Sequence, residues 1–170
     1  VPMKDLKEVI NKFDINNVSK SSAKFSKETL LSLNENTLKL FSFDEIKNKL
    51  INLQTNLQKE SFWRFVKNNI TYIHEVSIWE KVIKTINNYK DFNIDKNFLD
   101  IAANELPNDP YDYNTWDIWT KKIKDKTGIK GKDLFMPLRL ILTGMDKGPE
   151  LKNFLPLLDK QTLLRKFGKT

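Results

Sequence analysis

The sequence predicts an all-α fold, a helical bundle or cage of about eight to ten short helices. Apolar residues recur at intervals of three and four along most of the chain, which is the spacing of one face of a helix. No stretch alternates apolar and polar residues for long enough to indicate a strand. Five Gly and six Pro in 170 residues are too few for the many turns of a β-sandwich or barrel.

Three apolar stripes mark the helices expected in the first third of the chain. The first helix is expected within residues 3–13. Ser26 is placed to cap the second helix, and Ser42 with Glu45 has the capping-box spacing that opens a third. The stripes are Leu6, Val9, Ile10 and Phe13; Leu30, Leu31, Leu33, Leu38 and Phe41; and Ile46, Leu50, Leu53 and Leu57. We interpret these stripes as faces that pack in the core.

The middle of the chain predicts another helix followed by a polar connection. Ser77 and Glu80 repeat the capping-box spacing just before a further apolar stripe. Residues 87–95 have the Asn-rich, polar composition of a connection. We therefore place a boundary between two subdomains there, and divide the chain into residues 1–92 and 93–170.

Caps and helix breakers delimit the helices expected after this boundary. Pro137 is expected at the first position of an apolar helix, where a proline loses no hydrogen bond, and Gly144 at its C-terminal cap. The other expected starts are Asp95, Asn114 or Asp112, Gly148 with Pro149, and Asp159, and the other expected ends are Pro107 and Gly128.

Composition narrows the class of function. A formal net charge of +7 and a pI near 9.4 favour a polyanionic partner, nucleic acid ahead of an anionic membrane. The sequence has no Cys and one His, His74, which excludes thiol nucleophiles and Cys/His metal clusters. The absence of Cys fits a cytoplasmic protein. The apolar runs are too short to span a membrane, and the N-terminus does not resemble a signal peptide.

No catalytic or metal-binding constellation can be assigned. The sequence has no Gly-rich phosphate loop and no set of nucleophile, histidine and acid. His74 could act as a general base, but with no obvious partner residues a surface or core histidine is the favoured interpretation. We therefore expect no catalytic residue and no metal ligand in this chain.

The positive charge is concentrated between Lys121 and Arg139, where seven cations and two carboxylates give a net charge of +5. Within this stretch, residues 126–133 (KTGIKGKD) predict a glycine-containing loop. Its lysines Lys126, Lys130 and Lys132 are candidates to contact phosphates. The alternative is a basic loop that only faces solvent.

The segment that follows, Phe135 to Arg139, is a candidate for reading bases. An apolar helix start beside a basic loop offers a surface on which unpaired bases can stack, and the guanidinium of Arg139 could bond base edges. Pro137, Leu138 and Arg139 are the candidates. In the alternative, Phe135 and Leu138 belong to the core and Arg139 forms an ion pair with Glu150.

The same residues resemble bacterial glutamyl-tRNA synthetases in their C-terminal anticodon-binding region. The resemblance is strongest between Trp116 and Leu151, in the run Phe-x-Pro-Leu-Arg-x-x-Leu-Thr-Gly, residues 135–144, followed by Gly148-Pro149-Glu150. Weaker similarity extends back through Phe62–Ile70 to Phe25–Asn34 and Leu6–Phe13. It therefore covers nearly the whole chain.

The resemblance implies an anticodon-binding helical cage of the class I synthetase type, in which residues 1–92 hold stem-contacting helices and the first anticodon-binding part, and 93–170 the second. It implies an ATP- and Mg²⁺-dependent ligase that joins glutamate to its tRNA. The catalytic motifs do not occur in this sequence, so we expect a catalytically inactive, monomeric fragment that binds tRNA without a cofactor.

By position, the resemblance assigns base contacts to residues 137–139 and basic contacts to Lys130 and Lys132. In family members that distinguish glutamate from glutamine tRNA, an arginine of the first part discriminates. The matching stretch here is Lys67 to Asn69, without an arginine. Lys67 and Asn69 are therefore added as candidate RNA contacts, and charging of the glutamine tRNA stays open. The rival hypothesis is a helical protein-interaction module.

Overall fold

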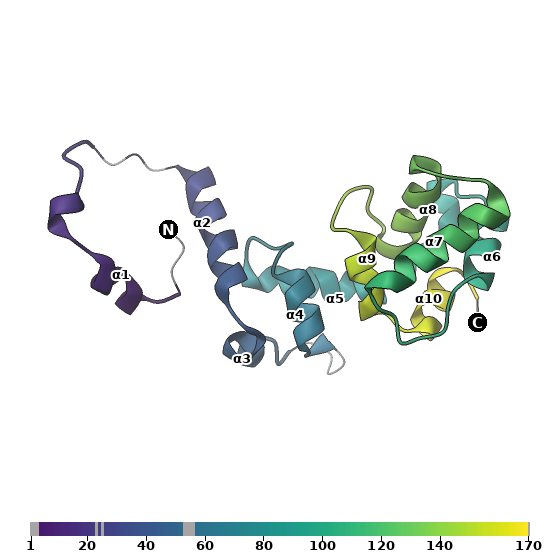
Figure 1. Ribbon diagram of the computed structural model, residues 1–170, viewed down its shortest axis with the longest axis horizontal. Coiled ribbons are helices and arrows are strands. Elements are labelled where there is room, and N and C mark those ends of the chain that lie inside the picture. The colour runs from purple at the N-terminus through teal and green to yellow at the C-terminus, as the bar shows by residue number, and fades with distance from the viewer. Residues whose placement is uncertain (1–3, 23, 25, 53–56, 170) are drawn as a thin grey trace. The chain divides into compact units, whose positions relative to one another are not determined.

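The computed structural model describes residues 4–22, 24, 26–52 and 57–169, and these form only helices and connections (Figure 1). The α-helices are α1 (Leu6–Lys12), α2 (Lys27–Leu40), α3 (Phe43–Ile46), α4 (Glu60–Val66), α5 (Val76–Lys84), α6 (Lys96–Asn104), α7 (Tyr113–Thr127), α8 (Lys132–Thr143), α9 (Leu151–Phe154) and α10 (Lys160–Lys166). Short 3₁₀ turns are η1 (Ile15–Asn17), η2 (Lys47–Lys49), η4 (Ile73–Glu75), η5 (Tyr89–Phe92) and η6 (Leu155–Leu157). The described residues contain no strand, which confirms the all-α prediction.

The chain separates into two compact units, Val1–Ser77 and Ile78–Thr170, and their boundary falls inside α5. We call them the N-terminal and C-terminal units. The boundary that we place at residues 92/93 concerns functional subdomains, and it stays a prediction. In the part of the chain that the structure describes, no helix combines the length and apolar character needed to cross a membrane.

The core of the N-terminal unit gathers around α3 and α4. Its buried apolar residues are Leu38, Ile46, Leu50, Leu57, Phe62, Trp63, Phe65, Val66, Ile70 and Val76. Ser42 and Glu45 form the expected capping box at the start of α3, and Ser26 caps α2 by accepting from the Thr29 amide. The core prediction is confirmed for Leu38, Ile46, Leu50 and Leu57; Leu53 lies outside the described residues, as do Met3 and Phe25.

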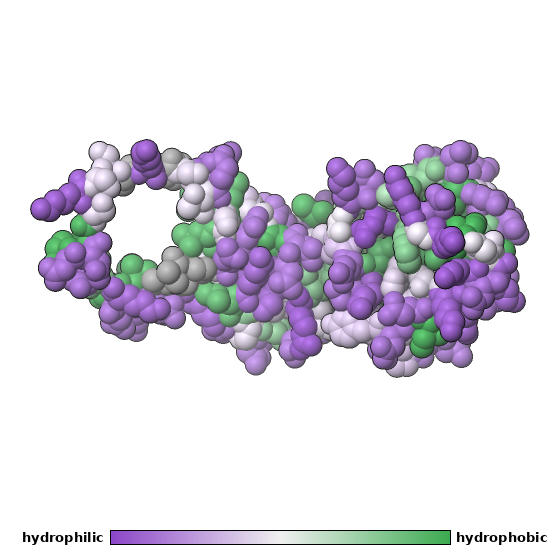
Figure 2. Space-filling view, turned by 45° about the horizontal axis from the view of Figure 1, so that its top comes forward, coloured by the Kyte–Doolittle hydropathy of each residue, from purple (hydrophilic) through white to green (hydrophobic). Residues whose placement is uncertain are grey.

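The first two apolar stripes do not pack as expected. Helix α1 buries no residue, and Leu6 and Ile10 are 70% and 63% exposed. On α2 only Leu38 is buried, while Leu30 and Leu33 are exposed. Figure 2 shows apolar surface in green among the hydrophilic side chains of this part of the molecule. Periodicity identifies the apolar side of a helix, but it does not establish that another element covers that side.

The C-terminal unit packs α6, α9 and η6 against α7, and α10 against α8 (Figure 1). Trp119 of α7 lies at the centre: its indole N–H donates to the Ala102 carbonyl at 2.8 Å, and its ring packs edge-on against Phe167. The fully buried side chains around it include Leu99, Ile123, Leu138, Ile141, Leu142, Phe154 and Leu163. This core holds α7 and α8 in fixed positions.

Two helix starts differ from the prediction. Helix α5 begins at Val76, because η4 already turns the chain; the capping box there joins Tyr72 and Glu75, and Ser77 lies inside the helix. Helix α8 begins at Lys132, so Pro137 sits inside it and not at its first position. A proline within a helix lacks the amide that would bond the carbonyl four residues earlier.

The caps expected at aspartate and glycine residues are confirmed. Asp95, Asp112 and Asp159 cap α6, α7 and α10 with their carboxylates, which decides between Asp112 and Asn114 in favour of Asp112. Gly128 and Gly144 end α7 and α8 with φ of 71° and 72°, a backbone conformation that favours glycine. The start expected at Gly148 and Pro149 is wrong: α9 starts at Leu151 with Glu150 as its N-cap, so Pro149 lies before the helix.

Candidate nucleic-acid interface

Helix α8 points its three candidate base-reading residues in three directions. Successive helical residues differ by about 100° around the axis, so three consecutive side chains spread over different sides of the helix. Leu138 is fully buried in the core, which corrects its assignment as an RNA contact through its side chain. Pro137 and Arg139 line two separate surface hollows.

The hollow at Arg139 is formed by α7, α8 and the segment that leads into α9. It is lined by Trp116, Asp117, Phe135, Arg139, Glu150, Leu151 and Lys152. Arg139 is half-buried, and its Nη1 donates to the Pro149 carbonyl at 3.0 Å. Among the described ion pairs none joins Arg139 to Glu150, so that alternative is wrong. The guanidinium is anchored at one nitrogen and offers its remaining donors to the hollow.

Phe135 presents an aromatic surface to the same hollow. The ring is 43% exposed and stacks on Trp116, with centroids 6.2 Å apart and an angle of 29° between the planes. The core alternative is therefore wrong for Phe135 and right for Leu138. An exposed ring backed by a buried Trp is a rigid surface on which an unpaired base can stack.

The hollow at Pro137 lies on another side of α8. Lys132, Met136 and Pro137 of α8 line it together with residues that open or precede α6, namely Phe92, Asn93, Ile94, Asp95 and Phe98. Its lining is mainly apolar, and the charged residues that line it are Lys132, Asp95 and Asp133. The structure thus brings Lys132 together with Pro137 and separates both from Arg139.

The basic loop is shorter than predicted. Helix α7 continues to Thr127 and α8 starts at Lys132, so only residues 128–131 connect them. Lys130 is exposed on this connection, and Lys132 is exposed on the first turn of α8. Lys126 lies in the last turn of α7 and forms an ion pair of 3.1 Å with Glu105. Lys126 is exposed and Glu105 is half-buried, so this pair lies at the surface, where an ion pair contributes about 1 kcal/mol.

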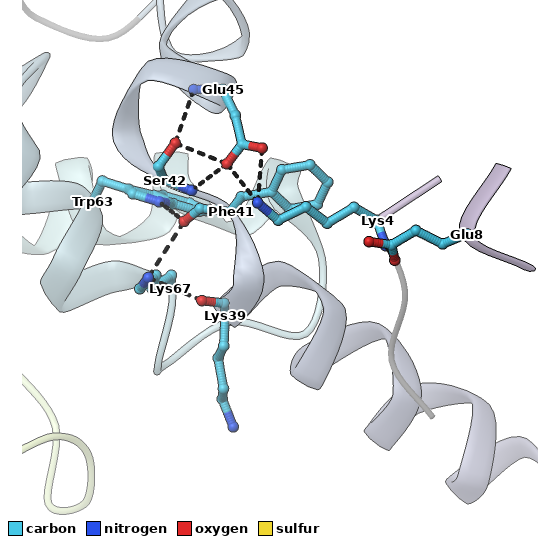
Figure 3. Close-up of polar contacts among 8 residues, drawn as sticks. All are labelled: Lys4, Glu8, Lys39, Phe41, Ser42, Glu45, Trp63 and Lys67. Carbon is cyan, nitrogen blue, oxygen red and sulfur yellow. Dashed lines mark hydrogen bonds and ion pairs between the residues drawn. The ribbon is translucent and has the colours of Figure 1, made fainter. Parts of the chain in front are cut away.

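Lys67 and Asn69, the candidates in the N-terminal unit, have structural partners, and Figure 3 shows those of Lys67. The Lys67 ammonium donates to the carbonyls of Lys39 at 2.9 Å and Phe41 at 3.3 Å. Both carbonyls lie at the C-terminal end of α2. A cation there compensates the unpaired carbonyls and the helix dipole. The Asn69 amide donates to the Phe65 carbonyl at 2.8 Å. Both side chains therefore order this unit, and their RNA contacts stay predictions.

The same region fastens the N-terminal segment to α3. Figure 3 shows Lys4 reaching the Glu45 carboxylate, at 2.7 Å, above the ring of Phe41. The hydrogen bond from Lys4, followed by those from Ser42, lowers the pKa of Glu45 to about 2. Glu45 therefore stays ionised across the physiological range, and this contact does not respond to moderate changes of pH.

The tertiary structure assembles features that the sequence pattern could not reveal. Trp116 and Phe135 come from different helices, so only their packing shows that they stack. Pro149 contributes a backbone carbonyl, which no side-chain pattern reports. His74 lies exposed and stacked on Tyr72, which identifies it as a surface histidine. Within the described residues, no three His, Cys, Asp or Glu side chains gather as they would around a metal ion.

Comparison with known proteins shows the family of the domain that contains these hollows. The family described as Anticodon binding domain matches residues 66–169, which include α7, α8 and both hollows. The chain belongs to the anticodon-binding domain family. The match also includes Lys67 and Asn69 in the N-terminal unit, so the anticodon-binding domain extends over parts of both units.

The relatives of this anticodon-binding domain are tRNA ligases. The chain is 38% identical over 166 residues to glutamate–tRNA ligase 1 of Rickettsia felis and 37% identical to glutamate–tRNA ligase 2 of Rickettsia canadensis. Glutamate–tRNA ligase 1 of Rickettsia rickettsii is 36% identical. Each alignment covers 98% of this chain and 37% of the relative. The chain thus spans little more than a third of the length of these ligases.

Proposed function

We propose that this chain binds the anticodon arm of a tRNA and serves a glutamate–tRNA ligase. The hollow at Arg139 is the observation that carries the proposal. An exposed ring and a half-buried guanidinium, which the Pro149 carbonyl anchors, line this hollow within a domain of the anticodon-binding family. Unpaired RNA bases are recognised by such combinations of stacking with hydrogen bonds to base edges.

The residues divide between reading bases and holding the backbone. Phe135 stacks on a loop base, and Arg139 donates to its edge. Lys130 and Lys132 attract the phosphates of the adjoining backbone, and Lys126 joins them when its ion pair with Glu105 opens. Pro137 contributes apolar contact from the second hollow. Leu138 acts only by holding α8 in the core.

The ligase context rests on the relatives. In this proposal the RNA is the glutamate tRNA, the chain acts as a monomer in the cytoplasm, and ATP and Mg²⁺ serve the glutamate-activating part of the ligase. No residue of this chain is assigned to ATP or Mg²⁺, and the 170 residues alone are proposed to bind RNA without catalysing a reaction. The proposal includes the glutamine tRNA as a second partner, because Lys67 to Asn69 contains no arginine.

Titration with an isolated anticodon stem-loop tests the proposal. The glutamate-tRNA loop should bind more tightly than a stem-loop of scrambled loop sequence, and its affinity should fall steeply with salt, because released counterions accompany each phosphate contact. Equal binding to both loops would leave only general affinity for RNA and remove the base-reading role.

A protein-interaction module is the second candidate. The exposed apolar side chains of α1 and α2 favour it, since large apolar residues at the surface commonly mark contact with another protein. This candidate needs neither the stacked ring nor the lysines of the connection. Binding of neither stem-loop, with a folded chain, would favour it over RNA binding.

A further inference from the structure

A second stacked aromatic surface lies in the N-terminal unit. Tyr72 and His74 stack with ring centroids 5.4 Å apart and an angle of 15° between their planes. Both side chains are exposed, and Tyr72 is 42% exposed. Neither residue belongs to the core of this unit, and the nearly parallel rings leave an outer aromatic face open to solvent. We call these two residues the Tyr72–His74 pair.

The backbone that carries the Tyr72–His74 pair is firmly held. The Glu75 carboxylate accepts from the amides of Thr71 at 2.7 Å and Tyr72 at 3.2 Å. From α2, Glu35 accepts from the Thr71 hydroxyl at 2.8 Å, and the Asn34 amide donates to the Thr71 carbonyl. The pair thus stands on a turn that is fixed from two sides. A pre-organised ring loses little conformational entropy when a flat ligand stacks on it.

We propose that the Tyr72–His74 pair is a second stacking site, which receives an unpaired base of the same RNA. This inference rests on the proposed function and extends it to a site in the N-terminal unit. Stacking on an aromatic side chain accepts any base, because every base has a π-face. The pair therefore adds affinity and orders the loop, while the hydrogen bonds at Arg139 supply the sequence preference.

The chemistry of the Tyr72–His74 pair favours a base over an apolar protein side chain. Both rings carry polar atoms at their edges. The nearby residues Thr71 and Glu75 are half-buried and polar, and Ser77 is exposed and polar, while the apolar residues close in sequence are the half-buried Ile73 and the exposed Ile78. A flat, polar-edged surface in a basic chain matches a nucleobase.

The test uses the full 170-residue chain and a glutamate-tRNA anticodon stem-loop that carries 2-aminopurine at one loop position at a time. Stacking on an aromatic ring quenches this fluorophore. We expect one loop position at which emission is quenched by the wild-type chain and by Tyr72→Phe, but not by Tyr72→Leu. His74→Ala should weaken this quenching. Tyr72→Leu should also weaken binding by about 5- to 150-fold, without changing the salt dependence.

Two further variants separate this inference from the proposed function. Phe13→Ala removes another exposed aromatic ring from the N-terminal unit, 65% exposed, and should bind like wild type. Phe135→Ala removes the proposed ring at Arg139. If Phe135→Ala loses binding while Tyr72→Leu binds and quenches like the wild-type chain, the second site is overturned and the proposed function stands. Absence of binding by the folded wild-type chain would overturn both.

Discussion

Phe135 rests on Trp116 with its ring 43% exposed, so a buried tryptophan supports an aromatic surface that faces solvent. Trp116 comes from α7 and Phe135 from α8, and both helices are fixed by the core around Trp119. The stack stands beside the guanidinium of Arg139, which a bond to the Pro149 carbonyl anchors. The stacked rings and the anchored guanidinium are the structural basis of the proposed RNA site. Mutation of Phe135 and of Arg139 can therefore separate the contribution of stacking from that of hydrogen bonding.

Phe135→Ala should weaken binding of the glutamate-tRNA stem-loop by about 1–3 kcal/mol, because a base loses its stacking partner. The fold should be retained, since the ring is partly exposed. Phe135→Tyr keeps the ring and should bind nearly as wild type. Fluorescence titration measures affinity, and urea unfolding measures stability. A loss of affinity in Phe135→Tyr equal to that in Phe135→Ala would argue against stacking.

Arg139→Ala should cost about 1–3 kcal/mol of binding to the same stem-loop, as a bidentate contact to a base edge does. Arg139→Lys keeps the charge but cannot form two parallel hydrogen bonds, so it should recover little of the loss. Titration of the stem-loop with each variant and with the wild-type chain measures these differences in affinity. Full recovery by Arg139→Lys would show that charge alone matters at this position.

Lys130→Ala should weaken binding of true and scrambled loops alike, because phosphate contacts carry no sequence information. The slope of log affinity against log salt should become shallower by about 1. Lys7→Ala is the control, because it removes the same charge from the exposed helix α1, which is distant in sequence from Lys130. An unchanged slope in Lys130→Ala would remove this lysine from the interface.

Gly144→Ala should destabilise the fold by about 1–2 kcal/mol. A Cβ at this position would lie 2.9 Å from Oδ1 of Asn87, and the backbone has φ of 72°. Asn87 itself donates to the Ile141 carbonyl at 3.0 Å, so moving it strains the end of α8. Gly128→Ala is the matched control, with φ of 71° and open space around the added atom. Urea unfolding should show the larger loss for Gly144→Ala, and equal losses would exclude the clash with Asn87.

Stability should rise with pH between about 8 and 10.5 because of Lys166. Its ammonium is buried, donating to the Val82 and Thr85 carbonyls, and burial lowers its pKa to about 8 from 10.5. In this interval the unfolded chain binds more protons than the folded chain, so raising the pH favours folding, by an amount on the order of 1–3 kcal/mol. Urea unfolding at several pH values measures the trend. The rise should be smaller in Lys166→Met, and an identical rise would assign it to other groups.

The sequence predicts well what depends on neighbouring residues and poorly what depends on packing. The caps at Ser42, Asp95 and Asp159 follow from local hydrogen bonds, and the structure confirms them. Pro137 is different: Gly131, with φ of 61°, turns the chain early enough for α8 to begin five residues before the proline. The start of a helix thus depends on the connection before it as well as on its most typical residues.

In the candidate site, too, the sequence pattern predicts the location of the segment but not the packing of its side chains. The motif at residues 135–139 predicts a base-reading site on α8, but a helix sends neighbouring side chains in different directions. Leu138 therefore enters the core and Arg139 faces the hollow. On α1 the error is the reverse: the apolar stripe predicts a buried face, but no residue of this helix is buried within this chain.

The central claim is that this chain reads an anticodon loop, and one titration tests it most directly. The full chain is titrated with the glutamate-tRNA anticodon stem-loop and with a scrambled-loop stem-loop, each at two salt concentrations. We predict tighter binding of the true loop at both concentrations, with a steep fall in both affinities as salt rises. Equal affinity for the two loops, or no binding by the folded chain, would contradict the claim.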